Sequence, residues 1–268
     1  VSILSLPLKT QNSVIGMLNL YRKHGTGFVG RDQRVAEAFA EQAATAIHNA
    51  RMYNSICANY WETVRSLARA IEARDSMTLG HSERVANLSL RIGQRLALPD
   101  DQLETLEFGA MLHDIGKIGL DEFVLGKSDE TLSLDEQMLM EMHPLIGKSI
   151  LEPVEFLRPV LPIVLYHHER WDGTGYPDGL ADTNIPLLAR IVAVANGYDC
   201  LMYQCATSMT EREGVDAIRM YSGTLYDPEI VEALAAVIET ECAEAQEAPV
   251  DQVMTSALEK SAVPQPTE

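Results

Sequence analysis

The segment HDIGK, residues 113–117, decides the fold of this chain, because it places an imidazole and a carboxylate side by side at the end of an apolar helical segment. Leu106 and Ala110 recur at helical spacing, and His113 falls on the same stripe. We therefore expect His113 to point into a helical core with Asp114 beside it. A single buried histidine is commonly a core residue with satisfied hydrogen bonds. The other histidines are therefore needed to distinguish a core residue from a metal ligand.

Five of the seven histidines lie in the central part of the chain, each near an end of an expected helix. They are His81, His113, His143, His167 and His168. Separations of roughly 25–30 residues accommodate a helix, a turn and a returning helix at about 1.5 Å per residue, so these side chains can converge in one bundle. Neutral imidazoles with carboxylates suit iron, manganese, zinc and other first-row divalent ions. The pattern favours a metal cluster over a coincidence of spacing.

Composition restricts the classes of partner and compartment. The chain has 268 residues and a formal net charge of −18. This charge argues against binding to a nucleic-acid polymer or an anionic membrane, since both need a positive protein surface. An anionic nucleotide can still bind where metal ions supply positive charge. Four cysteines without CxxC spacing indicate reduced thiols, and neither a membrane-spanning run nor a leader pattern is present, so we expect a cytoplasmic protein.

The first fifty residues predict a strand pair followed by a helix. VSILSLPL (1–8) and SVIGMLNLY (13–21) are β-rich runs separated by a polar turn. Asp32 is a candidate N-cap for the helix. The apolar residues that follow at helical spacing are Val35, Phe39, Ala43, Ile47 and Ala50.

A helical connector is expected next, because Tyr60, Val64, Leu67 and Ile71 keep helical spacing within residues 54–74. Such an apolar stripe needs a partner, and two interpretations stay open. The connector pairs in parallel with a second copy in a homodimer, or the same residues pack on the chain's own helical domain.

The remainder of the chain reads as helical up to a polar tail. Ser133 and Asp227, the latter followed by Pro228, are the clearest helix starts. Residues 185–201 form an expected buried helix rich in Ile, Val and Ala, and after Glu247 the apolar periodicity is lost, which is typical of disorder.

HDIGK, followed by HHERWDGTGYPDGL at 167–180, resembles the HD-GYP family, the metal-dependent phosphodiesterases of bacterial cyclic dinucleotide signalling. An ordered series of motifs is far more specific than an HD pair alone. The further matching motifs are GHSERV (80–85), HPLIG (143–147), IPLLARIVAVAN (185–196) and GTLYDPEIV (223–231). The resemblance implies a mainly α fold, an HD-type helical bundle, and hydrolysis of cyclic di-GMP.

The segments LSLPL, VIGMLNLY, GFVGRD and AEQAATAIHNARMY resemble the C-terminal part of a GAF domain, a small-molecule-sensing module. The two resemblances together imply four regions. These are a partial α+β GAF-like segment (1–53), a helical connector (54–74), an HD-GYP helical domain (65–245) and a disordered tail (246–268).

The resemblance implies two divalent metal ions, iron or manganese, and assigns their ligands residue by residue. The positions similar to the family's ligands are His81, His113, Asp114 and Asn196 for the first ion, and His143, His167 and His168, with Asp114 bridging, for the second.

The resemblance also implies substrate contacts. Lys117 matches the family's lysine near the scissile phosphate, where it stabilises charge or protonates the leaving oxygen. Lys127 and Arg190 are further candidates for binding phosphate, and Tyr176 offers an aromatic face. The loop 173–179 around Tyr176 is expected to shape the substrate pocket or to contact a signalling protein.

Two residues and one segment depart from the family pattern. Asn196 stands where the family has Asp, so the first ion is expected to bind more weakly, with Asp199 as a candidate to compensate. MYQCATSMT (202–210) lacks the family's basic side chains, which predicts weaker phosphate binding by about 1.5–3 kcal/mol for each lost contact. Met77 stands where some members place an acidic third-metal ligand, so we expect at most two ions.

Three functional hypotheses follow from these residues. The leading one is a two-metal phosphodiesterase that hydrolyses cyclic di-GMP to pGpG or GMP with reduced activity. The second is a catalytically silent module that acts through ligand binding or protein contact. The third is a hydrolase of another cyclic dinucleotide.

Overall fold

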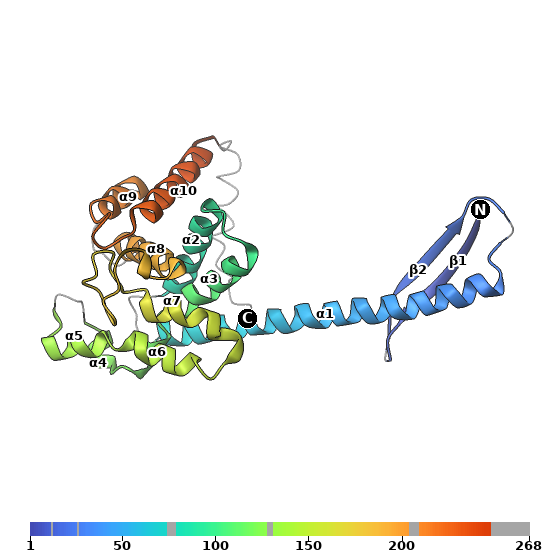
Figure 1. The fold of residues 1–268 in the computed structure, drawn as a ribbon, viewed down its shortest axis with the longest axis horizontal. Coiled ribbons are helices and arrows are strands. Elements are labelled where there is room, and N and C mark those ends of the chain that lie inside the picture. Colours follow the sequence, from blue (N-terminus) through green and yellow to red (C-terminus); the bar gives the residue numbers. More distant parts are fainter. Residues whose placement is uncertain (12, 26, 74–78, 128–130, 204–208, 248–268) are drawn as a thin grey trace, which may run out of the picture. The chain divides into compact units, whose positions relative to one another are not determined.

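The two predicted β-rich runs pair as an antiparallel hairpin, β1 (Ser2–Lys9) with β2 (Val14–Arg22), in which Leu4 lies opposite Leu20 and Leu6 opposite Leu18. Figure 1 shows the two strands beside the start of the long helix α1 (Gly30–Glu72). The computed structural model describes residues 1–11, 13–25, 27–73, 79–127, 131–203 and 209–247. Met77, the centre of the segment 202–210 and nearly all of the predicted tail therefore lie outside the described residues.

The chain divides into an N-terminal unit, residues 1–63, and a helical unit that begins at Val64. α1 is one continuous helix that includes both helical stretches predicted from the sequence. It begins two residues before Asp32, whose carboxylate accepts hydrogen bonds from the Val29 amide at 3.1 Å and from Arg22 at 3.0 Å. Asp32 thus stabilises the helix start from within the first turn rather than as the N-cap.

The apolar stripe predicted for the start of α1 is shifted by one position. Ala36, Ala40 and Ala44 are buried, whereas Val35 and Phe39 are 65% and 62% exposed. The three alanines are spaced four residues apart and so form one buried face of the helix. The larger residues are left on the outer face of the helix.

The connector stripe divides between two environments. Val64 and Ile71 are 3% and 8% exposed, so they pack on the helical unit, as the second interpretation expects. Tyr60 and Leu67 are 45% and 46% exposed. Packing on its own domain therefore accounts for half of the stripe, and the other half is partly exposed.

The second unit is helical, which confirms the predicted mainly α bundle (Figure 1). α2 packs against α3 and α8, and α6 packs against η1 and α7. The α-helices are α2 (His81–Arg95), α3 (Asp100–Leu112), α4 (Glu122–Leu125), α5 (Leu134–Met140), α6 (His143–Leu151), α7 (Leu161–Tyr166), α8 (Leu187–Tyr203), α9 (Glu211–Arg219) and α10 (Pro228–Glu247), and the short 3-10 segments are η1 (Ile115–Gly119), η3 (Glu155–Val160) and η4 (Asp182–Asn184).

Local signals explain where several helices begin. Ser133 forms a capping box with Glu136 at the start of α5. Asp227 accepts a hydrogen bond from the Glu229 amide at 2.9 Å, and Pro228 occupies the first position of α10. The helix starts predicted at Ser133 and Asp227 are confirmed.

Gly116 brings the HDIGK segment into backbone contact with α6. A Cβ atom at this position would lie 1.8 Å from the carbonyl oxygen of His143 and 2.6 Å from the backbone nitrogen of Gly147. Because no side chain fits there, η1 and α6 meet directly. This close approach brings Asp114 to the histidine that opens α6.

Replacing Gly116 by Ala is expected to lower the free energy of unfolding by about 1–3 kcal/mol or more, because the added methyl group displaces backbone rather than a flexible side chain. Denaturant unfolding measures the change. Gly30→Ala is the control, since a Cβ at Gly30 meets nothing within 4 Å. Equal stability of the two variants would show that η1 and α6 do not pack as described.

Candidate metal centre

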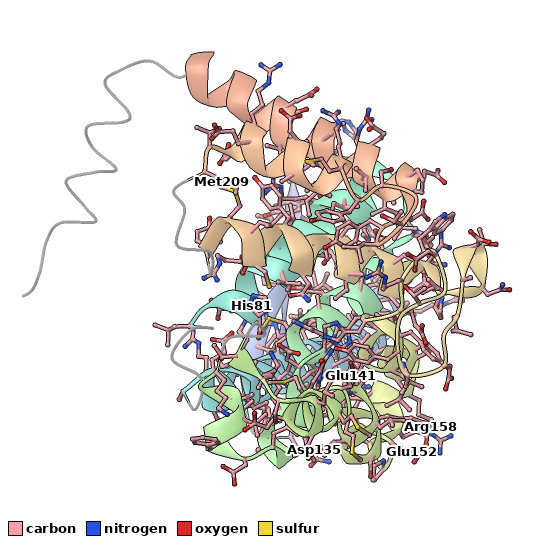
Figure 2. The ribbon with its side chains drawn as sticks, turned by 90° about the vertical axis from the view of Figure 1, so that its left-hand side faces the viewer. His81, Asp135, Glu141, Glu152, Arg158 and Met209 are labelled. Carbon is pink, nitrogen blue, oxygen red and sulfur yellow. The ribbon has the colours of Figure 1, made fainter. Side chains whose placement is uncertain are left out.

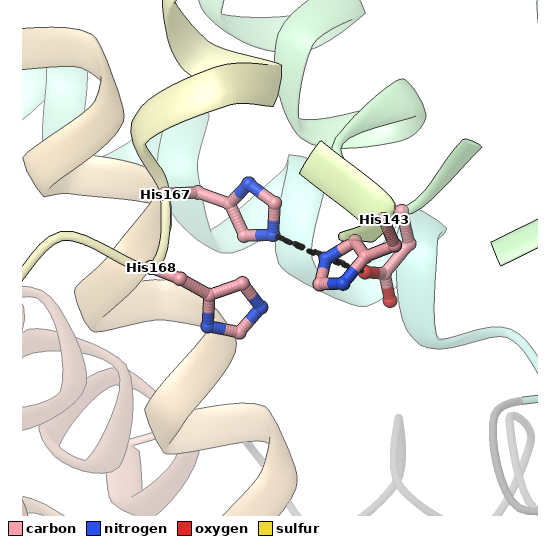
Figure 3. A group of neighbouring side chains, drawn as sticks. His143, His167 and His168 are labelled. Atoms are coloured by element: carbon pink, nitrogen blue, oxygen red, sulfur yellow. Dashed lines mark hydrogen bonds and ion pairs between the residues drawn. The ribbon is translucent and has the colours of Figure 1, made fainter. Parts of the chain in front are cut away.

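The five central histidines converge in the helical unit, each at a helix end. His81 and His143 are the first residues of α2 and α6, His113 follows α3, and His167 and His168 follow α7. Figure 2 places His81 among the helices, and Figure 3 shows the rings of His143, His167 and His168 turned toward one another. His81, His113, His143 and His167 are at most 2% exposed.

Asp114 connects two groups of candidate ligands. One group contains Asp114, His143, His167 and His168, and the other contains His81, His113 and Asp114. Within each group, one ligand atom from every residue lies within 4.8 Å of the others. The structure therefore brings together the six metal-ligand candidates that carry an imidazole or a carboxylate.

Backbone carbonyls fix the tautomer of three histidines. The Nδ1 atoms of His113, His143 and His167 lie 2.7, 2.7 and 2.9 Å from the carbonyl oxygen three residues earlier in the chain. A carbonyl oxygen only accepts hydrogen bonds, so each Nδ1 carries the proton and donates it. Each Nε2 atom consequently presents a lone pair toward the centre of the cluster.

The Asp199 carboxylate accepts the hydrogen bond from Nδ1 of His81. Its Oδ2 atom lies 2.6 Å from His81 Nδ1, and Arg84 donates to the same carboxylate at 2.6 and 3.0 Å. A carboxylate behind a histidine is the usual arrangement around a metal-binding imidazole, because it orients the ring and increases its basicity. Asp199 thus supports a candidate ligand through Nδ1, and its carboxylate is occupied by His81 and Arg84.

The inward atoms repel one another unless a cation lies between them. The Nε2 atoms of His143 and His167 are 3.2 Å apart, and Asp114 Oδ1 lies 3.3 and 3.9 Å from them. The other oxygen, Oδ2, lies 3.5 Å from His113 Nε2, a buried atom without a hydrogen-bond partner among the described residues. Because these atoms all present electron pairs in a buried space, the donor set fits divalent cations.

Burial keeps the imidazoles in the form that binds metal. Desolvation lowers the pKa of His113 to about 4 and also lowers the pKa of His143, His167 and His168. Desolvation opposes ionisation of Asp114, but the Lys117 ammonium and the neighbouring imidazoles outweigh it and hold the pKa of this carboxyl well below its usual range. Near pH 7 these four histidines offer neutral nitrogens and Asp114 offers an ionised carboxylate.

Lys117 and Tyr176 lie at the partly exposed edge of the cluster. The Lys117 ammonium donates to Asp114 Oδ2 at 2.7 Å, and its side chain is 19% exposed. Tyr176 stacks on His168 with ring centroids 4.9 Å apart and an interplanar angle of 18°. These two predicted substrate-contacting residues therefore adjoin the candidate ligands.

The loop that carries Tyr176 is anchored by Glu169, which the sequence interpretation missed. Glu169 is 3% exposed, and its carboxylate accepts from the amides of Asp178 at 2.8 Å and Leu180 at 3.0 Å. A Cβ at Gly175 would lie 2.4 Å from the Arg170 backbone nitrogen, so the loop folds tightly back on the residues after His168. The only sequence signal for this role is an acidic residue directly after two histidines.

Three other predicted site residues have different surroundings. Lys127 forms an ion pair with Glu136 at 2.6 Å, and Arg190 forms a short ion pair with Asp227. Their charges are compensated locally, and their roles in substrate binding stay predictions. Asn196 lies on α8 and is partly exposed, and its role as a ligand of the first ion also stays a prediction.

The described helices include none that combines the length and the apolar character needed to cross a membrane.

Comparison with protein-family models and curated proteins gives matches to both parts of the chain. An HD domain model matches residues 65–230, and a GAF domain model matches residues 1–49. The cyclic di-GMP phosphodiesterase response regulator RpfG of Xanthomonas campestris is 41% identical over 65% of this chain and 47% of its own length. A cyclic di-GMP phosphodiesterase of Thermotoga maritima is 38% identical over 65% of this chain and 48% of its own length. The chain thus spans about half the length of these relatives.

A solved structure supports the fold. A cyclic GMP-AMP specific phosphodiesterase of Vibrio cholerae matches with a TM-score of 0.56 and 21% sequence identity, over 72% of this chain and 52% of that chain. At this level of identity the match supports only the helical fold.

Addition of Mn²⁺ is expected to raise the melting temperature of the wild-type chain, because a ligand that binds only the folded state stabilises it by about 2.7 kcal/mol at a concentration of 100 Kd. Asp114→Ala should abolish this gain, since the carboxylate belongs to both ligand groups. Asp135→Ala, an exposed position on α5, should retain it. An equal gain in both variants, measured by thermal unfolding, would count against the cluster as the metal site.

Proposed function

The chain belongs to the HD domain family, and from that premise we propose that it is a metal-dependent phosphodiesterase that hydrolyses cyclic di-GMP to pGpG or GMP. The convergence of imidazole lone pairs on the Asp114 carboxylate carries this proposal. The names of the two relatives at 41% and 38% identity support the choice of substrate.

The two ligand groups support our proposal of two divalent ions, which we propose to be iron or manganese. When bound, such ions neutralise charge on the phosphate and lower the pKa of a coordinated water. The residues proposed to hold them are His81, His113, Asp114 and Asn196 for the first ion, and His143, His167 and His168, with Asp114 shared, for the second.

The chain's own side chains position the substrate and move a proton. Lys117 is held by Asp114 at the partly exposed edge of the cluster, where its ammonium can stabilise a phosphate oxygen and donate a proton to the leaving oxygen. Tyr176, stacked on His168, offers an aromatic face to a nucleobase. The loop that carries Tyr176 is also our candidate for contact with a signalling protein.

The silent module is the alternative function, and specific observations favour it. Asn196 brings no charge to the first ion, and residues 202–210 contain no Lys or Arg. Lys127 and Arg190 already form ion pairs with Glu136 and Asp227. Fewer cations are therefore available to phosphate, which supports reduced turnover in the leading proposal and ligand binding without turnover in the alternative.

Lys117→Gln is expected to lower the kcat for cyclic di-GMP by about 100-fold or more, the usual scale for loss of a general acid. Its metal content should equal that of the wild type, because Lys117 is not a proposed ligand. Turnover in the presence of Mn²⁺ or Fe²⁺ and elemental analysis of the same samples measure the two quantities. Lys9→Gln, an exposed position in β1, is the matched control.

The same assay separates the alternatives. Wild-type protein with two ions and no turnover of cyclic di-GMP would contradict the leading proposal. Turnover of cyclic GMP-AMP in its place would identify another cyclic dinucleotide as substrate, and binding of cyclic di-GMP without any turnover would identify the silent module.

A homodimer through α1 is a further part of the proposal. Exposed apolar residues recur every seven positions along this helix, and Phe39, Tyr53, Tyr60 and Leu67 are 62%, 68%, 45% and 46% exposed. Ala46 fills the remaining position of the series and is exposed as well. Two helices that pair in parallel bring together apolar residues from two positions of each seven-residue repeat, and this exposed series supplies one of the two, so the occupant we propose is a second copy of this chain.

Tyr53→Lys is expected to shift the chain from dimer to monomer, because it places a charge in the seam between the two helices. Met52→Lys is the matched control, since Met52 is 51% exposed and lies next to the repeat but outside it. Sedimentation equilibrium measures both molar masses. A monomeric wild type, or equal dissociation in both variants, would rule out pairing along this stripe.

A further inference from the structure

The helix that carries His81 lacks a cap of its own. Gly80 is the N-cap residue of α2, with a φ of 73°, and it has no side chain to accept a hydrogen bond. The first amides of a helix need acceptors from elsewhere, particularly where they are buried. His81 is the next residue, so the position of this candidate ligand depends on what satisfies these amides.

Glu72, the last residue of α1, supplies the missing cap. One carboxylate oxygen accepts from the Gly80 amide at 2.8 Å, and the other accepts from the Ser82 amide at 2.8 Å. The side chain is well protected, because Glu72 is only 5% exposed. A carboxylate at a helix N-terminus forms charge-assisted hydrogen bonds and interacts favourably with the helix dipole. The two amides flank His81, so Glu72 fixes the backbone on both sides of it.

The His81 ring is held by a different helix. Asp199 on α8 orients the ring through Nδ1, while Glu72 on α1 holds the backbone. A cavity of about 10 Å³, room for about one water molecule, is lined by Glu72 and His81 together with Asp114 and Lys117. The end of α1 therefore adjoins the cluster directly.

We propose that Glu72 is a positioning residue for the first metal ion, so that the affinity for this ion depends on the last turn of α1. The inference rests on the proposed two-metal site. Glu72 donates no ligand atom in this proposal and acts through its hydrogen bonds to the backbone on either side of His81. Because coupling between two sites is reciprocal, binding of the first ion in turn stabilises the last turn of α1.

The first test is metal binding by Glu72→Gln. The amide oxygen of Gln can accept from one of the two backbone amides, but its NH₂ group cannot accept from the other. We expect one of two ions to bind about 10-fold or more weakly, the usual effect of removing a group that supports a ligand, while the other ion binds as in wild type. Titration with Mn²⁺ measures both affinities. Glu41→Gln, the same change at an exposed position of α1, should leave both unchanged.

The outcomes separate this inference from the proposed function. Wild-type binding of two ions with unchanged affinities in Glu72→Gln would overturn the positioning role and leave the proposed function intact. Equal loss of both ions in a variant that melts at a lower temperature would indicate general destabilisation, and would overturn it as well.

A second measurement does not depend on metal. In the metal-free chain, hydrogen exchange of the amides at Gly80, His81 and Ser82 should be at least 10-fold faster in Glu72→Gln than in Glu41→Gln, because one amide loses its acceptor and the first turn of α2 opens more often. Exchange that is equal in the two variants overturns the proposal even if the wild type binds no metal. Faster exchange confined to this turn supports it.

Discussion

The mutual repulsion of buried lone pairs around Asp114 is the constraint on which the rest of the helical unit depends. Histidine nitrogens from several helices and a carboxylate converge with their electron pairs facing inward, an arrangement that is unfavourable unless positive charge lies between them. The bundle holds it together through contacts outside the cluster. Backbone carbonyls accept hydrogen bonds from the Nδ1 atoms of three imidazoles, the Asp199 carboxylate bonds to Nδ1 of His81, and Gly116 lets two backbone segments meet.

The sequence predicted the histidines and the aspartate of the cluster, because their residue types and their positions near helix ends can be recognised from nearby residues. The helix starts at Ser133 and Asp227 depend on residues within three positions. Five histidines near helix ends favoured an arrangement in which their side chains meet inside one bundle. The carboxylates that support the cluster were harder to find. Asp199 lies 118 residues from His81, and Glu72 and Glu169 bind amides of loops and helix ends that carry no side-chain signal.

The sequence also did not predict which face of α1 is buried. Alanines and larger apolar residues both recur at helical spacing on this helix, and only the packing of the folded unit shows that Ala36, Ala40 and Ala44 lie inside while Phe39 lies outside. The ion pairs of Lys127 and Arg190 were not predicted either, since their partners Glu136 and Asp227 lie 9 and 37 residues away in the sequence. A basic residue in the sequence is available to a ligand only if the fold has not already paired it.

The carbonyl contacts of the histidines have a consequence for how the ions are acquired. Since Nδ1 of His113, His143 and His167 already holds the ring proton and Asp114 is ionised, these four residues need release no proton to bind a cation near neutrality. A thiolate site must discharge protons when it loads, and its occupancy therefore follows acidity. For these three imidazoles and the Asp114 carboxylate, metal binding near neutrality is therefore expected to depend on the concentration of the divalent ion rather than on pH.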